Sequence, residues 1–215
     1  MPLRWVLFDL NGTLLDPSGV GEPVGLGAAD SLAALDEAVM LAMAETLSGH
    51  WRPLPDFLRA ALIRRAQIGG RPGRIDDAMQ RASRMPPYPE AAAALDRVRE
   101  GGLEAGVLTN SATDAAELAL EAAGLRERLS LVAGVDDVKA FKPDPRVYRM
   151  GAARAGVPPA EICMVAAHGW DLLGASRTGL RTGWVSRKER YFLETHPQPD
   201  ASGTDLLALA GLLTG

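Results

Sequence analysis

Asp9 stands near the carboxyl end of a short apolar segment, Arg4–Leu10, which is directly followed by the turn signal Asn11-Gly12. The segment has the composition of a β-strand. Because open α/β sheets bind their ligands beyond the carboxyl ends of their strands, a carboxylate at this place could meet a substrate. By itself, an aspartate followed by Gly-Thr three residues later is explained as well by a strand and turn with a surface aspartate.

Thr109, Asn110 and Ser111 form a second polar group, between a predicted strand at Leu103–Leu108 and a predicted helix. Ser111 and the acidic residue three positions later make a variant of the capping box, so we expect Ser111 to cap this helix. Backbone N–H groups at a helix start bind anions. We therefore expect Thr109 and Asn110 to contact the substrate.

Short apolar segments alternate with Ala-rich helical segments through most of the chain. This alternation predicts a mostly parallel sheet covered by helices on both faces, the α/β doubly wound fold of Rossmann-like proteins. A polar tail, Glu189–Thr204, is expected to form a surface loop before a last helix. The predicted strands are Arg4–Leu10, Leu103–Leu108, Leu129–Ala133, Ile162–Ala166 and Arg181–Val185, and the predicted helices are Pro89–Glu100, Thr113–Ala123, Pro145–Ala155 and Leu172–Thr178.

The segment 17–86 interrupts this alternation. It opens on a Gly/Pro-rich connector and continues with helical patterns at Asp30–Ser48, Arg52–Ile68 and Arg74–Arg84. An insertion of this length exceeds an ordinary crossover between strands. We therefore predict a helical cap domain at 17–86, inserted into an α/β core domain formed by 1–16 and 87–215.

Composition narrows the class of protein. The chain has 215 residues and a net charge of -4, with basic and acidic residues interspersed. This pattern gives no basic face for nucleic acid or for an anionic membrane. No secretory signal or membrane-spanning stretch is recognised, and the single cysteine, Cys163, has no disulfide or metal partner. We expect a cytoplasmic protein with an anionic small-molecule substrate, in which a Met/Ala/Leu-rich cap face could pair two copies as a homodimer.

Four motifs, taken in order, resemble those of the haloacid dehalogenase superfamily. The motif that begins at Asp9 matches the family's Asp-x-x-x-Thr, Thr109 matches its hydroxyl-bearing motif, Lys142 its lysine, and Asp171 its acidic fourth motif. The resemblance implies that Asp9 attacks the substrate and carries it as a covalent ester. A cation keeps a neighbouring carboxylate ionised and stabilises anionic groups, which is the role implied for Lys142.

Two departures separate the chain from the magnesium-dependent phosphatases of this superfamily. Asn11 stands where those enzymes have a general-acid aspartate, and Ala167 replaces the first aspartate of their fourth motif. Magnesium prefers oxygen ligands that include carboxylates. We therefore expect no cofactor and no metal ligands, and Mg²⁺ would be required only if the protein were a phosphatase.

The same positions are similar to the metal-independent (S)-2-haloacid dehalogenases of the superfamily. The shared features are Lys-Pro-Asp-x-Arg-Val-Tyr at Lys142–Tyr148 and the pair Trp170-Asp171. The resemblance implies displacement of a halide from C2 of a short carboxylic acid, followed by hydrolysis of the ester. It also implies that Tyr148 supports the site, and that Asp171 positions Lys142 and the hydrolytic water.

Other positions depart from that branch. Asn11 stands where a tyrosine is usual, and Ala166 and His168 replace a serine and an asparagine. The cap arginine of the branch falls near Leu35, and the nearest downstream arginine, Arg52, is out of register. His168 either forms a supporting hydrogen bond beside the fourth motif or acts as a base on the hydrolytic water.

The predicted site therefore has two groups of residues: Asp9, Lys142 and Asp171 as catalytic residues, and Asn11, Thr109, Asn110, Tyr148 and His168 as substrate-binding residues. Two other functions stay open. One is a magnesium-dependent phosphatase that forms an aspartyl-phosphate. The other is a binding protein that shares the fold without strong catalysis, and the convergence of two carboxylates and a lysine argues against it.

Overall fold

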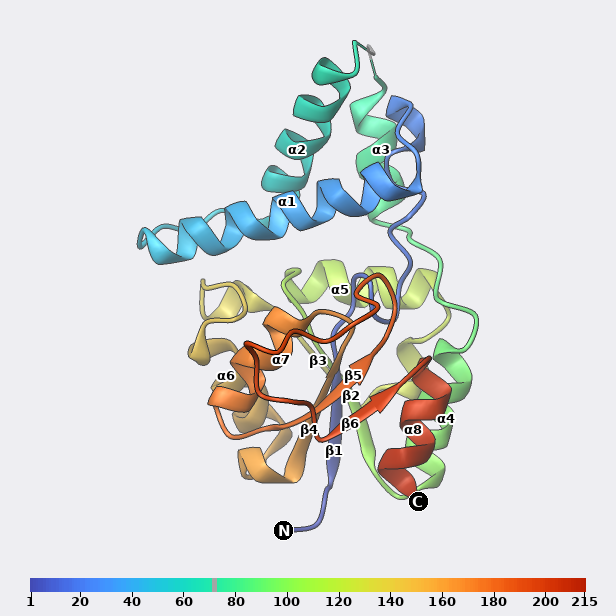
Figure 1. Cartoon of the computed structure of the whole chain (residues 1–215), viewed down its shortest axis with the longest axis vertical. Coiled ribbons are helices and arrows are strands. Elements are labelled where there is room, and N and C mark those ends of the chain that lie inside the picture. The colour runs from blue at the N-terminus through green and yellow to red at the C-terminus, as the bar shows by residue number, and fades with distance from the viewer. Residues whose placement is uncertain (71–72) are drawn as a thin grey trace.

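Six parallel strands form one open sheet in the computed structural model, which describes residues 1–70 and 73–215. Their spatial order is β3-β2-β1-β4-β5-β6 (Figure 1). The predicted α/β fold with a doubly wound parallel sheet is therefore confirmed. The strands are β1 Trp5–Phe8, β2 Glu104–Leu108, β3 Leu131–Ala133, β4 Ile162–Ala166, β5 Arg181–Val185 and β6 Ala201–Gly203.

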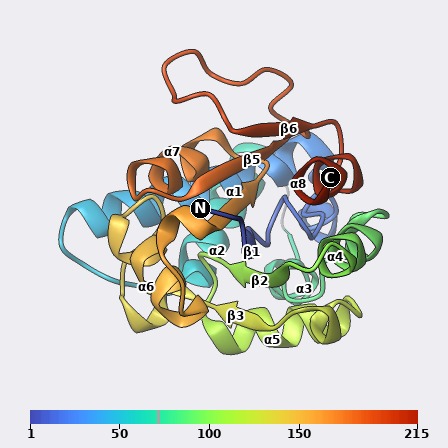
Figure 2. The same cartoon turned by 90° about the horizontal axis from the view of Figure 1, so that it is seen from below.

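Helices cover both faces of the sheet. Helices α4 and α8 pack together on one face, and α6 and α7 pack together on the other (Figure 2). The two central strands, β1 and β4, are consequently apolar along their length and buried except for the half-buried Trp5, as a doubly covered parallel sheet requires. The core helices are α4 Ala91–Glu100, α5 Thr113–Ala122, α6 Pro145–Ala155, α7 Gly169–Arg177 and α8 Leu206–Thr214.

Cys163 lies in β4 at the centre of this sheet and is fully buried. Burial raises the pKa of its thiol to about 12. The side chain is therefore a protonated thiol at neutral pH and fills the core as a small apolar group.

Three helices of the inserted segment form a separate layer beyond the carboxyl ends of the strands (Figure 1): α1 Ala28–Leu47, α2 Leu54–Ile68 and α3 Ile75–Ala82. We call these the cap helices. Short 3-10 turns at Glu22–Val24, Arg126–Arg128, Val135–Asp137 and Pro159–Glu161 complete the helical elements of the described residues. The domain division at 16/17 and 86/87 stays a prediction, which this layering supports.

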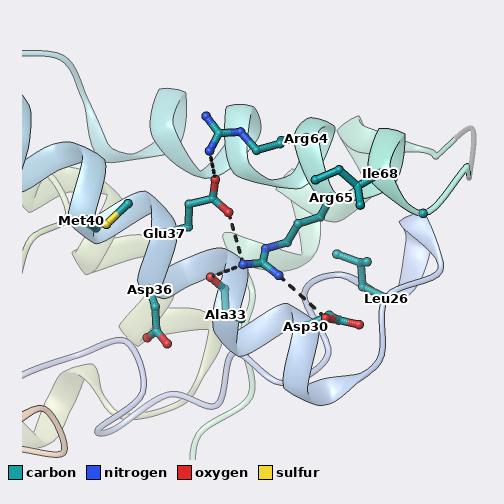
Figure 3. A pocket seen from close by; sticks show the side chains of 10 residues that line it. Leu26, Asp30, Ala33, Asp36, Glu37, Met40, Arg64, Arg65 and Ile68 are labelled. Atoms are coloured by element: carbon teal, nitrogen blue, oxygen red, sulfur yellow. Dashed lines mark hydrogen bonds and ion pairs between the residues drawn. The ribbon is translucent and has the colours of Figure 1, made fainter.

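Charged side chains tie α1 to α2. Glu37 accepts a hydrogen bond of 2.6 Å from Arg64 and forms an ion pair of 3.3 Å with Arg65. Arg65 also donates to the carbonyl of Ala33 at 3.2 Å and approaches Asp30 at 3.8 Å (Figure 3). These residues line a groove between α1 and α2.

The tail after Glu189 differs from the expected surface loop, because Ala201–Gly203 form the edge strand β6. Three small residues without apolar alternation carry no strand pattern. Their alignment comes from a tertiary contact: the carboxylate of Asp200 accepts hydrogen bonds from the backbone N–H of Thr182 at 2.8 Å and from its hydroxyl at 3.1 Å. This anchor places the segment beside β5.

Within the described residues, no helix has both the length and the apolar content to cross a membrane. Several large apolar side chains of the cap helices are exposed, namely Met40, Leu47, Ile63 and Ile68. The homodimer through the cap stays a prediction.

Candidate active site

Lys142 joins the two predicted catalytic carboxylates. Its ammonium Nζ donates to Asp9 Oδ1 at 3.2 Å and to Asp171 Oδ2 at 2.8 Å. The side chains of Lys142 and Asp171 are 0% exposed, and Asp9 is 5% exposed. Three segments that are far apart in the sequence thus meet at the carboxyl edge of the sheet, which places a buried cation between two buried anions.

The second oxygen of Asp9 is held by Thr13, whose hydroxyl donates to Oδ2 at 2.9 Å. The same hydroxyl accepts the backbone N–H of Ala167 at 3.0 Å, so the loop after β1 is fastened to the end of β4. Thr13 is absent from the predicted set of site residues, although it is the threonine of the Asp-x-x-x-Thr motif. That motif was the signal that could have identified it.

Gly12 makes room for His168 beside this loop. It has φ +85°, and a Cβ at this position would lie 2.9 Å from His168 Cε1. A larger residue would therefore be strained in the backbone and would press on the histidine. The turn signal Asn11-Gly12 consequently serves the site as well as the turn.

Tyr148 fixes the segment that bears Asp171. Its hydroxyl donates to Asp171 Oδ1 at 2.8 Å and lies 2.9 Å from the carbonyl oxygen of the same residue. Gly174, one turn along α7, allows this approach, because a Cβ there would lie 2.5 Å from the Tyr148 hydroxyl oxygen. Tyr148 is fully buried, so it orients Asp171 and through it Lys142.

Thr109 and Asn110 lie at the end of β2 next to the same carboxylates. Asn110 Oδ1 accepts the backbone N–H of Lys142 at 2.9 Å, and Thr109 Oγ1 accepts the backbone N–H of Ser111 at 3.1 Å. Asn11 reaches across from the first loop and donates to Ser111 Oγ at 3.3 Å. All eight predicted residues are thus placed around one edge of the sheet, and their roles stay predictions.

The expected capping of α5 by Ser111 is wrong. The residue that precedes the helix is Ala112, and it provides no side-chain cap. Instead, the Asp136 carboxylate accepts the backbone N–H of Thr113 at 2.8 Å and its hydroxyl at 3.1 Å. A carboxylate from a distant loop therefore satisfies the helix start, a contact that local spacing could not indicate.

Burial and the Lys142 cation act in opposite directions on the pKa values of the two carboxylates. Burial alone would raise the pKa of Asp9, but Lys142, with contributions from His168 and Thr13, outweighs it and lowers that pKa to about 2. Burial raises the pKa of Asp171 despite the opposing effect of Lys142. Asp9 is therefore the carboxylate that stays fully ionised at any working pH, as a nucleophile must.

His168 lies against Asp9, with 3.4 Å between its Nδ1 and Asp9 Oδ2. The two side chains can form an ion pair, but their geometry does not meet the criteria for a hydrogen bond. Its ring stacks on Trp170 with 5.4 Å between centroids. Burial would lower the pKa of His168, but Asp9, Asp171 and Glu189 outweigh burial and raise it. The imidazole therefore keeps its positive charge to a higher pH than an isolated histidine does.

A cavity of about 20 Å³ opens beside Asp9, between the sheet edge and the cap helices. Leu35 lines it where the related enzymes are expected to have an arginine, while Arg52 is 68% exposed and pairs with Glu45. Of the residues that the structure describes, His168 is the one lining side chain that can carry a positive charge. The lining residues are Asp9, Asn11, Leu35, Asp36, Val39, Leu54, Thr109, Asn110, His168 and Trp170.

The site does not fit a magnesium ion. Lys142 takes one oxygen of each carboxylate, and Thr13 and Tyr148 take the others. Position 167, where a further carboxylate would be needed, is an alanine. Among residues 1–70 and 73–215, no cluster of three or more His, Cys, Asp or Glu side chains could hold a metal.

The fold and these motifs define a family. A family model described as haloacid dehalogenase-like hydrolase matches residues 3–179. Because this match covers most of the sequence, the chain belongs to the haloacid dehalogenase-like hydrolases.

Within this family, the chain is similar to several 2-haloacid dehalogenases. The chain is 32% identical over 196 residues to (S)-2-haloacid dehalogenase 4A of Burkholderia cepacia. The aligned residues cover 86% of this chain and 84% of the relative. The L-2-haloacid dehalogenase of Xanthobacter autotrophicus has a TM-score of 0.90 at 25% identity, with 99% of each chain covered. A further L-2-haloacid dehalogenase structure has a TM-score of 0.93 at 28% identity and covers 100% of both chains.

Proposed function

We propose that the protein hydrolyses the carbon–halogen bond of (S)-2-haloacids, with Asp9 as the nucleophile. The observation that carries this proposal is the ionised, buried Asp9 carboxylate, aimed into a cavity by Lys142 and Thr13. The relatives named (S)- and L-2-haloacid dehalogenases support the choice of substrate. The enzyme is a hydrolase that uses its own side chains and needs no cofactor.

In the first step, an oxygen of Asp9 attacks C2 of the substrate on the side opposite the halogen. The carbon–halogen bond breaks, and the halide leaves with the electron pair, so no general acid is needed and Asn11 is no handicap. Positive charge at Lys142 and His168 offsets the negative charges of substrate and halide. The product of this step is an ester between the Asp9 carboxylate and C2.

In the second step, water attacks the carbonyl carbon of the Asp9 ester. The bond between that carbon and the oxygen attached to C2 breaks, which releases a 2-hydroxy acid and restores the carboxylate. One proton is lost to solvent over the full reaction. Asp171, whose pKa is raised by burial and which is held by Lys142 and Tyr148, is placed to orient this water.

We expect activity to be independent of divalent metal. Turnover of (S)-2-chloropropanoate should remain within about twofold after treatment with a strong chelator, because Lys142 already supplies the charge that a metal would provide. Halide release, measured with and without added Mg²⁺, checks this. Magnesium-dependent release of phosphate from phosphate esters, with no halide release, would instead support the phosphatase.

We expect His168 to produce an alkaline limb in the pH profile. Its raised pKa means that the cation is present at low pH and is lost as pH rises through a value above 6.5. The kcat/KM value for a haloacid should therefore fall at high pH, by about tenfold if the cation holds the substrate's anionic groups. Asp9, with a pKa of about 2, should add no acid limb above pH 4.

His168→Gln should remove this limb and lower kcat/KM at neutral pH. The matched control is His50→Gln, because His50 is exposed, its ring lies 3.0 Å from the Ser48 carbonyl oxygen, and it does not line the cavity beside Asp9. If the alkaline limb persists unchanged in His168→Gln, it arises from the titration of another group.

A further inference from the structure

A second cavity, of about 350 Å³, lies between the cap helices and helix α5 of the core, which face each other in Figure 1. It adjoins the catalytic cavity, because Asn11, Leu35 and Leu54 line both. The catalytic cavity has a volume of only about 20 Å³, room for about one water molecule. The larger cavity, which adjoins the one beside Asp9, is therefore the space that can hold the bulk of a substrate.

The lining of this second cavity is apolar. No charged side chain contributes to it among the residues that the structure describes, and its few polar members already have partners. Ser31 donates to the carbonyl of Gly27 at 3.0 Å, Ser83 donates to that of Gln80 at 2.8 Å, and Ser111 accepts from Asn11 at 3.3 Å. The described apolar lining includes Leu10, Val20, Leu58, Met79, Met85 and Leu118.

We propose that this cavity binds a long alkyl or aryl substituent at C2 of the substrate, so that the enzyme prefers bulky 2-haloacids to 2-halopropanoates. This inference rests on the proposed function. A polar group in the cavity would lose its hydrogen bonds to water and find none in return, whereas an apolar group gains free energy on burial. A cavity of about 150 Å³ holds a benzene ring, so this one has room for a phenyl group with a linker.

The position of the shared residues gives the orientation of the substrate. The carbon–halogen bond lies where the two cavities meet, with Asp9 and His168 on the side of the catalytic cavity. The substituent then passes Leu35 and Leu54 into the apolar space. Leu35, which stands near the position expected for a cap arginine, thus forms an apolar passage between the two cavities.

The test is a series of (S)-2-bromo acids from propanoate to octanoate, with 2-bromo-3-phenylpropanoate as the aryl member. We expect kcat/KM to rise by about two- to fourfold for each added methylene group. The same preference should appear in binding. The Asp9→Asn variant should bind 2-bromooctanoate at least about tenfold more tightly than 2-bromopropanoate, as measured by calorimetry.

Two variants test whether the preference for long substituents comes from this cavity. Ala115 and Leu118 line the cavity from α5. Both residues are also exposed, Leu118 to 65%, so substitutions at these positions should leave the fold intact. Ala115→Phe fills the cavity and Leu118→Glu places a charge at its rim, and each should lower the ratio of octanoate to propanoate turnover by at least about fivefold. Ala122→Phe, an exposed alanine of the same helix outside the lining, is the matched control and should keep the ratio.

The outcomes separate this inference from the proposed function. Turnover of 2-bromopropanoate with no gain along the series, or the same ratio in all three variants, would overturn the inference and leave the dehalogenase function intact. If no haloacid of any length is hydrolysed, the proposed function is wrong. Equal binding of octanoate and propanoate by the Asp9→Asn variant would overturn the inference in either case.

Discussion

Replacing Asp9 by asparagine is expected to lower haloacid turnover by about 10⁴-fold or more, because an amide of nearly the same shape is a poor nucleophile. The fold should persist, since Lys142 keeps its 2.8 Å contact with Asp171. Halide release measures the loss, and circular dichroism and thermal unfolding check the fold. Asp96→Asn is the matched control, because that aspartate pairs with Arg128 on the surface, away from the site.

A labelling experiment tests the covalent step directly. Under single turnover in water enriched in oxygen-18, water attacks the carbonyl carbon of the ester, so the label should enter the Asp9 carboxylate. The 2-hydroxy acid then carries an original oxygen of Asp9. Label found only in the product, together with an active Asp9→Asn variant, would show that water attacks C2 without a covalent ester.

Lys142→Met has the second large effect, and it acts on both activity and stability. It removes the cation that contacts Asp9 and Asp171, and it leaves two buried carboxylates facing one another. We expect a loss in kcat/KM of about 10²-fold or more, because charge stabilisation in a buried site is lost. The free energy of unfolding should fall by about 3–5 kcal/mol, the usual cost of removing one partner of a buried ion pair.

The two effects can be separated by pH and by a control variant. Lowering the pH should restore part of the stability of Lys142→Met, because protonation of one carboxylate relieves the repulsion, but it should not restore turnover. Lys139→Met is the control, since Lys139 is exposed and forms no part of the site. An active, fully stable Lys142→Met enzyme would contradict the assigned arrangement of charges.

The sequence by itself determined the class of fold and indicated that three of the charged residues of the candidate site lie close together. Alternating apolar and Ala-rich segments predict a parallel sheet, and this follows from local periodicity, which does not depend on distant contacts. The positions of Asp9, Lys142 and Asp171 at the sheet edge followed as well, because parallel strands bring their carboxyl ends to one side.

Tertiary structure alone decided how these residues interact. Only the folded chain shows that Lys142 is shared by two carboxylates, that His168 turns towards Asp9, and that Thr13 holds its second oxygen. Likewise, the cap of α5 comes from Asp136 and the alignment of β6 from Asp200, both through long-range hydrogen bonds. Such contacts, like the apolar cavity under the cap helices, arise from surfaces that meet only after folding, so no local pattern encodes them.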